Sequence, residues 1–231
     1  MEEQLNMLKI YDVSMAIHPG MAVYKNKAEK RPAMEVSRDE SKGILETRLY
    51  LDAHTGTHVD APLHVIPGGP GVESLSPAAF FGPCRVLDLT GVPEKIERRD
   101  LMPHGLSAGD FILFQTRNSW STDFDFNFVY ISAEAAQYLA EAGVRGVGLD
   151  ALGVERDQPG YPTHRTLLAR NIMVIEGLRL KEVPPGSYFL LAAPLLLPGV
   201  EAAPARVLLA GRQDFYSFLS NMNESREMRS E

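Results

Sequence analysis

Three imidazoles and one carboxylate lie within eleven consecutive residues, which read HTGTHVDAPLH from His54 to His64. Imidazole nitrogen and carboxylate oxygen are ligand atoms that zinc, manganese and iron accept in proteins. The alternative is a polar loop whose histidines only bind backbone groups. That interpretation suits a lone histidine better than three histidines and an aspartate at this spacing. The stretch therefore predicts a metal centre.

The spacing of these donors indicates how the backbone must run. His54 and His58 are four residues apart, which places two side chains on one face of a helix. His58 and Asp60 are two apart, which aligns side chains only on an extended chain. No single regular element gathers all three, so the backbone must change direction near His58. Because His64 continues the spacing of two from Asp60, we expect it to approach the same site.

The composition narrows the class of protein. The chain has 231 residues, of which 45% are hydrophobic and 23% charged, as is typical of a globular enzyme. A formal net charge of −7 and the lack of a basic run argue against nucleic acid or an anionic membrane as a partner. Cys84 is the only cysteine, which excludes a disulfide framework and a thiolate metal cluster. With no signal-peptide pattern and no apolar run of membrane-spanning length, we expect a cytoplasmic protein.

The hydrophobic patterns predict one α/β domain with mixed sheets and flanking helices. A hairpin precedes His54, and the strand, helix, strand rhythm of 111–149 indicates parallel pairing. Strands are predicted at 8–17, 33–38, 44–52, 83–90, 111–116, 144–149, 171–176, 188–193 and 206–210. Helices are predicted at 76–81, 97–101, 133–142 and 165–170.

Three segments have open interpretations. The glycine-rich stretch 67–71 is either a flap over the site or a connecting loop. The aromatic side chains of 117–128 either pack under their own loop or line a substrate pocket.

We expect a domain over 1–212 and an extension over 213–231, partly helical and then frayed. The apolar side chains of this extension either dock on the chain itself or favour a homodimer or homotetramer; they are Phe215, Tyr216, Phe218 and Leu219.

Two distant residues are candidates for completing the metal centre. His164 follows a proline-rich and glycine-rich loop ahead of the helix predicted at 165–170. Glu176 ends the apolar run 172–175, and a carboxylate buried there needs a partner. A metal ion would supply that partner, and a salt bridge to Arg179 is the alternative.

The stretch from His54 to His64 resembles the HxGTHxDxPxH signature of the bacterial kynurenine formamidase or cyclase family of metal-dependent hydrolases. Asp12 with its neighbours is similar to the family's opening strand. The segments 147–150 and 175–178, with His164 between them, match its later pattern in the same order. The resemblance covers about 10–210 and leaves only the tail outside.

This resemblance implies a swivelling β/β/α fold and hydrolysis of a C–N or related acyl bond in a small-molecule amide. It assigns one metal to His54, His58 and Asp60, and a second to Asp60, His164 and Glu176, with His64 as the acid/base. A related branch that opens isatin and other cyclic amides uses a single manganese and different late ligands. The presence of both His164 and Glu176 favours the two-metal branch.

The donor set also limits the chemistry. Nitrogen and oxygen ligands without sulfur fit Zn²⁺ best, with Mn²⁺ as an alternative, at one or two ions per chain. Such an ion lowers the pKa of a coordinated water to about 7 and polarises a carbonyl. An imidazole that is not a ligand, as expected for His64, can return a proton to the leaving nitrogen. We predict an arylformamidase-type amide hydrolase. The alternatives are a cyclic-amide or lactone hydrolase on the same centre, and a non-catalytic metal-binding protein.

Overall fold

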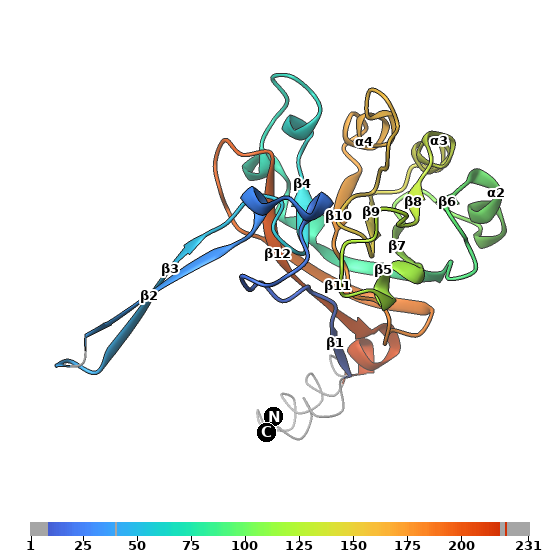
Figure 1. Cartoon of the computed structure of the whole chain (residues 1–231). Helices are drawn as coiled ribbons and strands as arrows, with labels where there is room; N and C mark the ends of the chain where they lie inside the picture. Colours follow the sequence, from blue (N-terminus) through green and yellow to red (C-terminus); the bar gives the residue numbers. More distant parts are fainter. Residues whose placement is uncertain (1–8, 40, 218–219, 221–231) are drawn as a thin grey trace, which may run out of the picture.

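An eight-stranded mixed sheet organises the chain in this computed structural model, which describes residues 9–39, 41–217 and 220 (Figure 1). The strands are β1 (Ile10–Asp12), β2 (Ala33–Asp39), β3 (Ile44–Tyr50), β4 (His58–Asp60), β5 (Phe81–Asp88), β6 (Lys95–Ile96), β7 (Phe111–Gln115), β8 (Tyr130–Ile131), β9 (Gly146–Leu149), β10 (Met173–Glu176), β11 (Gly186–Pro194) and β12 (Ala202–Gly211). The α-helices are α2 (Arg98–Leu101), α3 (Ala133–Ala142) and α4 (Pro162–Leu168). The predicted α/β class with mixed pairing is confirmed.

The sheet closes on itself, which the sequence did not predict. Its strand order is β1-β12-β11-β5-β7-β9-β10-β4, and β4 pairs with β12 as well as with β10. Seven strands therefore form a barrel, with β1 added outside on β12. Strands β5, β7, β9 and β10 run parallel, and the other pairs in this sheet are antiparallel. Closure leaves β4 with no free edge.

Alternate residues of the barrel strands enter two separate cores. Val59, Leu113 and Ile175 belong to the cluster that fills the barrel, as a small barrel requires. Val147 and Val174 belong to the outer cluster, which α3 and α4 cover. The outer face of β10, beside β4, is therefore the face that meets the helices.

Helix α3 has the boundaries that the sequence predicted, and its ends show why. The Ser132 hydroxyl accepts a hydrogen bond from the Ala135 amide, at 3.1 Å. Gly143 follows the last turn with φ 72°, a left-handed conformation that glycine adopts without a steric penalty. These end signals are local, so they can be read from the sequence alone.

Several predicted boundaries are wrong. The first strand is only Ile10–Asp12: the Val13 amide still donates to Val207 of β12, but the Val13 carbonyl accepts from the Arg179 amide outside this strand pair. Strand β12 begins at Ala202, whereas the prediction began at 206. Proline usually ends a strand, but Pro204 lies inside this one. The helix predicted at 165–170 is α4, Pro162–Leu168, which brings His164 inside its first turn. The helix predicted at 76–81 is a 3₁₀ turn, Pro77–Phe80.

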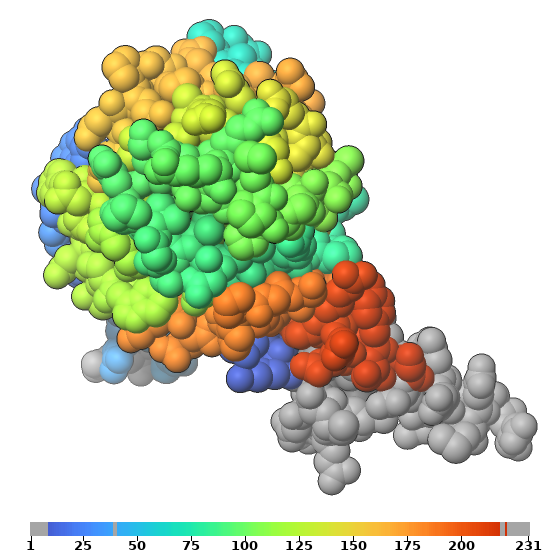
Figure 2. Space-filling view, turned by 90° about the vertical axis from the view of Figure 1, so that its right-hand side faces the viewer, coloured from blue at the N-terminus to red at the C-terminus, as the bar shows by residue number. Residues whose placement is uncertain are grey.

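Two segments lie at the margins of the barrel. The predicted hairpin, β2 and β3, projects away from the body as a two-stranded arm (Figure 1). Below the barrel in Figure 1, beside β1, residues 212–217 are helical and lie against β11 (red and orange in Figure 2). Phe215 stacks on Phe189 with ring centroids 4.2 Å apart, so this part of the tail docks on its own chain. Phe218 and Leu219 lie outside the described residues. In the part of the chain that the structure covers, no helix is both long and apolar enough to cross a membrane.

Candidate metal centre

Strand β4 supplies the two most deeply buried donors. Val59 points into the barrel, so His58 and Asp60 point to the outer face, with relative exposures of 1% and 0%. On neighbouring β10, Glu176 lies directly opposite His58 in the strand register. Because β4 is paired on both sides, these three side chains are held by a rigid support.

The predicted change of backbone direction occurs just before β4. Gly56 has φ 65°, and a side chain there would meet Ile17 Cγ1 at 3.3 Å. The Thr57 hydroxyl fastens the turn: it donates to the Gly177 carbonyl at 2.7 Å and accepts from the Met15 amide at 2.7 Å. This turn folds His54 back over the strand.

His64 reaches the site by a route that the sequence did not predict. It ends a 3₁₀ turn, Pro62–His64, instead of continuing the extended chain. Its Nδ1 lies 3.1 Å from His54 Nε2. The expectation that His64 approaches the site is met, although the spacing argument assumed the wrong backbone conformation.

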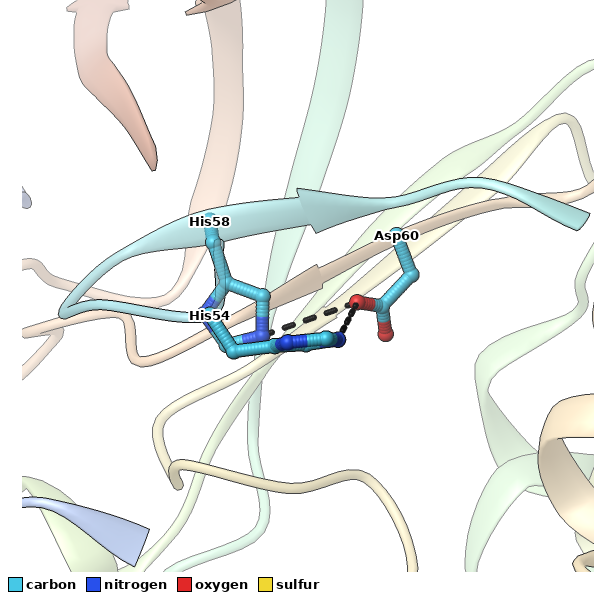
Figure 3. Close-up of side chains that lie close together, drawn as sticks. All are labelled: His54, His58 and Asp60. Carbon is cyan, nitrogen blue, oxygen red and sulfur yellow. Dashed lines mark ion pairs between the residues drawn. The ribbon is translucent and has the colours of Figure 1, made fainter. Parts of the chain in front are cut away.

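The first group of donors surrounds one oxygen of Asp60. The Nε2 atoms of His54 and His58 both lie 3.6 Å from Asp60 Oδ1 (Figure 3). The Nδ1 atom of His58 lies 2.8 Å from the Gly56 carbonyl, which favours an N–H on Nδ1. The lone pair of Nε2 is then available to bind a metal ion. Suitable ligand atoms of His54, His58 and Asp60 all lie within 4.8 Å of one another.

A second group shares Asp60. The other oxygen, Oδ2, lies 3.8 Å from His164 Nε2, and one ligand atom each from Asp60, His64 and His164 also fall within 4.8 Å of one another. Glu176 stands between the two groups: its Oε2 lies 3.1 Å from His58 Nε2 and its Oε1 lies 3.2 Å from His164 Nε2. The other five residues singled out in the sequence therefore gather around Asp60.

Glu155 is a member of the site that the sequence analysis missed. Its Oε2 lies 2.7 Å from His164 Nδ1 and accepts from the His164 amide, while Oε1 accepts from the Thr163 amide. A carboxylate bound to the first amides of α4 also suits the positive end of a helix. Glu155 thus orients the His164 ring. The available signal was an acidic residue shortly before a helix that begins with proline, but the misplaced helix start concealed it.

The alternative of a salt bridge between Glu176 and Arg179 is wrong. The Arg179 guanidinium donates to the carbonyls of Ser119 and Ser121, at 3.3 Å and 2.6 Å. Glu176 instead faces the histidines, and its Oε1 accepts from the Val154 amide at 2.5 Å.

The site contains buried polar atoms without partners. Among the described residues, the only buried side-chain nitrogen or oxygen atoms without a well-aligned hydrogen bond are His58 Nε2 and both oxygens of Asp60. His58 Nε2 has an ion pair with Glu176, whereas the Asp60 oxygens approach imidazole nitrogens only at 3.6 Å and 3.8 Å, beyond hydrogen-bond distance, and such buried polar atoms are costly and rare. A divalent cation between them would satisfy all three, so the residues present fit a metal ion.

Local electrostatics also favour a cation here. Burial alone would lower the pKa of His58 and of His164, but neighbouring carboxylates outweigh it. Glu176 and Asp60 raise the pKa of His58 to about 9, and Glu155, Glu176 and Asp60 raise the pKa of His164 to about 10. Burial would raise the pKa of Glu176, yet the two histidines hold it well below its usual value. Burial lowers the pKa of His54, with Asp60 opposing, so this imidazole is available as a neutral ligand. A bound metal would take the place of the protons on His58 and His164.

A cavity of about 780 Å³ lies above the donors. His54, His64, His164 and Glu176 form part of its wall. Together with the acidic Glu155 and Asp157, the wall also contains two tyrosines and four basic residues, which are Tyr24, Tyr161, Lys25, Lys27, Lys30 and Arg165. The volume suits a small organic molecule.

Neither of the two loops considered in the sequence lines this cavity. The segment 67–71 is held on both sides, because the Ile66 amide donates to the Pro62 carbonyl and the Pro70 carbonyl accepts from the Leu63 amide, which favours a connecting loop. In the aromatic loop, Phe124 packs edge-on against Phe126 and Phe128, which favours packing under its own loop. The tyrosine or phenylalanine side chains that line the cavity are instead Tyr24 and Tyr161.

Comparisons with known proteins agree with this geometry. The Cyclase family model matches residues 11–156. Kynurenine formamidase from Salinibacter ruber is 35% identical over 211 residues, covering 90% of this chain and all of the relative. A solved structure described as a potential metal-dependent hydrolase with cyclase activity is 48% identical, with a TM-score of 0.83 over 89% of this chain and 98% of the other.

A more distant structure extends the range of relatives. Isatin hydrolase A from Labrenzia aggregata is 25% identical, with a TM-score of 0.78 over 89% of this chain and 94% of the other. The family match spans more than half of the chain, and the curated relative spans nearly all of it. The resemblance seen in the sequence is confirmed: this chain belongs to the cyclase family, and it is a metal-dependent hydrolase.

Proposed function

We propose that this chain hydrolyses the formamide bond of N-formylkynurenine or a closely related arylformamide, in the cytoplasm, with Zn²⁺ as the metal. The observation that carries the proposal is Asp60, whose two buried oxygens lack partners and face two different sets of histidines. His54, His58 and Asp60 would hold one ion. Asp60, His164 and Glu176 would hold a second. The names of relatives, a formamidase and an isatin hydrolase, support an amide bond as the target.

Bound Zn²⁺ would supply Lewis acidity and an activated water at neutral pH. The chain's own residues supply orientation and proton transfer. Glu176 orients the His58 and His164 rings, and Glu155 binds the other nitrogen of the His164 ring. His64 lines the cavity beside these donors, so it is placed to give a proton to the leaving nitrogen as the C–N bond breaks.

The basic side chains in the cavity wall favour an amide that carries a carboxylate over one that carries none. Lys30 is paired with Asp52 at 3.1 Å, and Lys25 lies 3.8 Å from Asp157. Lys27 and Arg165 form no ion pair among the described residues, although Arg165 donates to the Gly160 carbonyl. N-formylkynurenine carries a carboxylate that such cations would attract. A cyclic amide such as isatin lacks one, and it is the second candidate because of the isatin hydrolase relative.

A substrate panel with metal control tests the proposal. We expect the purified protein to carry one to two divalent ions per chain, to hydrolyse N-formylkynurenine faster than formanilide, isatin or a lactone, and to lose all activity in a chelator. Initial rates by product absorbance, with elemental analysis of the same samples, measure both effects. Restored activity on adding Zn²⁺ rather than Mn²⁺ would support the metal assignment.

Full activity after exhaustive removal of metal would disprove metal dependence. Faster turnover of isatin than of every formamide would favour the second candidate. Binding of metal without turnover of any compound in the panel would favour a non-catalytic metal-binding protein.

Glu176→Gln should weaken the second ion much more than the first. Glu176 comes from β10, whereas the first ion keeps all three donors on the segment that ends in β4. Metal titration followed by elemental analysis should show about one ion retained per chain. Glu182→Gln, at an exposed position outside the cavity, is the matched control. Retention of both ions at full occupancy would show that Glu176 is not a ligand.

A further inference from the structure

Three imidazoles around Asp60 are oriented in the same way. Each turns Nε2 toward an oxygen of Asp60, at 3.6 Å for His54, 3.6 Å for His58 and 3.8 Å for His164; the first two contacts are drawn in Figure 3. The other ring nitrogen, Nδ1, is then left to face the surrounding chain. A histidine that binds a metal usually donates its second N–H to an oxygen of the protein, which fixes the ring and makes it a better ligand.

Two of these rings have a well-defined acceptor for that second N–H. His58 Nδ1 lies 2.8 Å from the Gly56 carbonyl, and His164 Nδ1 lies 2.7 Å from Glu155 Oε2. The acceptor that orients His54 is therefore the one that remains to be assigned.

Two carboxylates lie beside His54. Its Nδ1 is 3.4 Å from Asp52 Oδ1 and 3.7 Å from Glu201 Oε1. Asp52 is the better anchored of the two, because Lys30 Nζ donates to both of its oxygens, at 3.2 Å and 3.1 Å. Asp52 Oδ1 also accepts from the His54 amide at 3.0 Å. This carboxylate is thus fixed before a metal arrives.

The backbone around Asp52 is fixed as well, whereas Glu201 is not. The Asp52 carbonyl accepts from both the amide and the hydroxyl of Thr55, at 3.0 Å and 2.7 Å. In the part of the chain that the structure describes, the Glu201 side chain has no hydrogen bond or ion pair apart from its contact with His54. A longer and unanchored side chain loses more rotamer freedom when it is held in one geometry. The structure therefore favours Asp52 over Glu201.

Lys30 has a different role from the other basic residues in the cavity wall. Its ammonium is bound to both oxygens of Asp52, and the two side chains are 27% and 29% exposed. An ammonium group held in this way is not free to bind the carboxylate of a substrate. What it does instead is prevent the Asp52 carboxylate from rotating away from His54.

We propose that Asp52 is a positioning residue of the metal centre. Its carboxylate accepts the Nδ1 proton of His54 in a hydrogen bond and so presents His54 Nε2 to the first ion, while Lys30 holds the carboxylate in place. This inference rests on the proposed function, which places the first ion on His54, His58 and Asp60. Asp52 and Lys30 then act on the metal only through His54.

The Zn²⁺ affinity of carboxylate-to-amide variants tests this proposal. Asp52→Asn keeps an oxygen for the His54 amide but loses the anionic acceptor, so the affinity for the first ion should fall by about 10- to 100-fold. Glu201→Gln removes the same charge at nearly the same distance from His54 and should keep the wild-type affinity. Glu155→Gln should weaken the second ion instead. Titration with Zn²⁺ in competition with a chromophoric chelator measures each affinity.

Lys30→Met separates positioning from simple electrostatics. Removing a positive charge near a cation site should raise Zn²⁺ affinity if only charge matters. Positioning predicts the opposite, because Asp52 is then free to rotate, and we expect a loss smaller than that of Asp52→Asn. Adding Lys30→Met to Asp52→Asn should cause no further loss, since Lys30 acts through Asp52. A gain in affinity, or losses that add, would overturn the role of Lys30.

Thermal unfolding separates positioning from a purely structural role in the turn. Asparagine can accept the same backbone hydrogen bond as aspartate, so the metal-free Asp52→Asn chain should melt as wild type does. The rise in melting temperature on adding Zn²⁺ should be smaller than in wild type, because the folded state binds the ion less tightly. A lower metal-free melting temperature with an undiminished rise would show that Asp52 only holds the turn.

The outcomes distinguish this proposal from the proposed function. A wild-type chain that binds no Zn²⁺ would overturn both. A wild-type chain that binds Zn²⁺, together with an Asp52→Asn variant of unchanged affinity, would overturn the positioning role alone. Loss of affinity in Glu201→Gln instead of Asp52→Asn would assign the orientation of His54 to Glu201 and would also overturn it.

Discussion

Asp60→Asn should release both metal ions and lower hydrolysis to the rate measured in a chelator. Asp60 is fully buried, and each of its oxygens faces a different set of imidazoles. Asparagine keeps the shape but offers one neutral oxygen and an N–H group that repels a cation. Since a bound metal contributes several kcal/mol to stabilising charge in the transition state, we expect a loss on the order of 10³-fold or more. Initial rates and elemental analysis measure the two effects.

A thermal unfolding experiment separates this effect from misfolding. The melting temperature of the wild-type chain should rise on adding Zn²⁺, because a ligand of the folded state stabilises it. Asp60→Asn should melt cooperatively and show no such rise. Asp110→Asn, at a carboxylate that pairs with Arg85, should respond as wild type does. Full metal occupancy in Asp60→Asn would show that Asp60 is not the shared ligand.

The local part of the site could be predicted because its information is local. His54, His58 and Asp60 lie within seven residues, and their spacing required the turn that Gly56 provides. Helix α3 was predicted for the same reason, since its serine and glycine end signals are adjacent to it in sequence.

The remainder depended on contacts between distant segments. Barrel closure rests on β4, a three-residue strand that pairs with both β10 and β12, and three residues carry no periodicity to detect. Glu155 is recognisable only once α4 is seen to begin at Pro162, because its role is to bind the first amides of that helix and the His164 ring. His164 and Glu176 were already candidates from their own segments, Glu176 because a carboxylate at the end of a buried strand needs a partner, but only the family motif distinguished a metal from a salt bridge as that partner.

For the arm formed by β2 and β3, the sequence predicts the strands but not what surrounds them. Its strands and alternation could be predicted from the sequence, yet the same pattern predicts that one face should be covered. The structure of one chain leaves that face exposed. An alternating pattern identifies a buried face but does not specify what buries it.

His64→Ala should leave the metal bound and slow turnover by roughly 10²–10⁴, the usual effect of removing a positioned acid or base. His54, His58 and Asp60 already provide three protein ligands, and a catalytic metal keeps a position free for water or substrate. His64 lines the cavity and contacts His54 through its Nδ1, so it lies beside that group rather than within it. Single-turnover rates and metal content of the same preparation measure the effect. His104→Ala, outside the cavity, is the control.

The competing role for His64 is that of a ligand, because its ring nitrogen also falls within the group formed with Asp60 and His164. The two roles differ in what the variant loses. A ligand variant loses an ion, and added metal partly restores its rate. An acid/base variant keeps both ions, stays slow at every metal concentration, and loses one limb of the pH–rate profile. Loss of metal in proportion to loss of activity in His64→Ala would therefore assign His64 to the metal instead of to the proton.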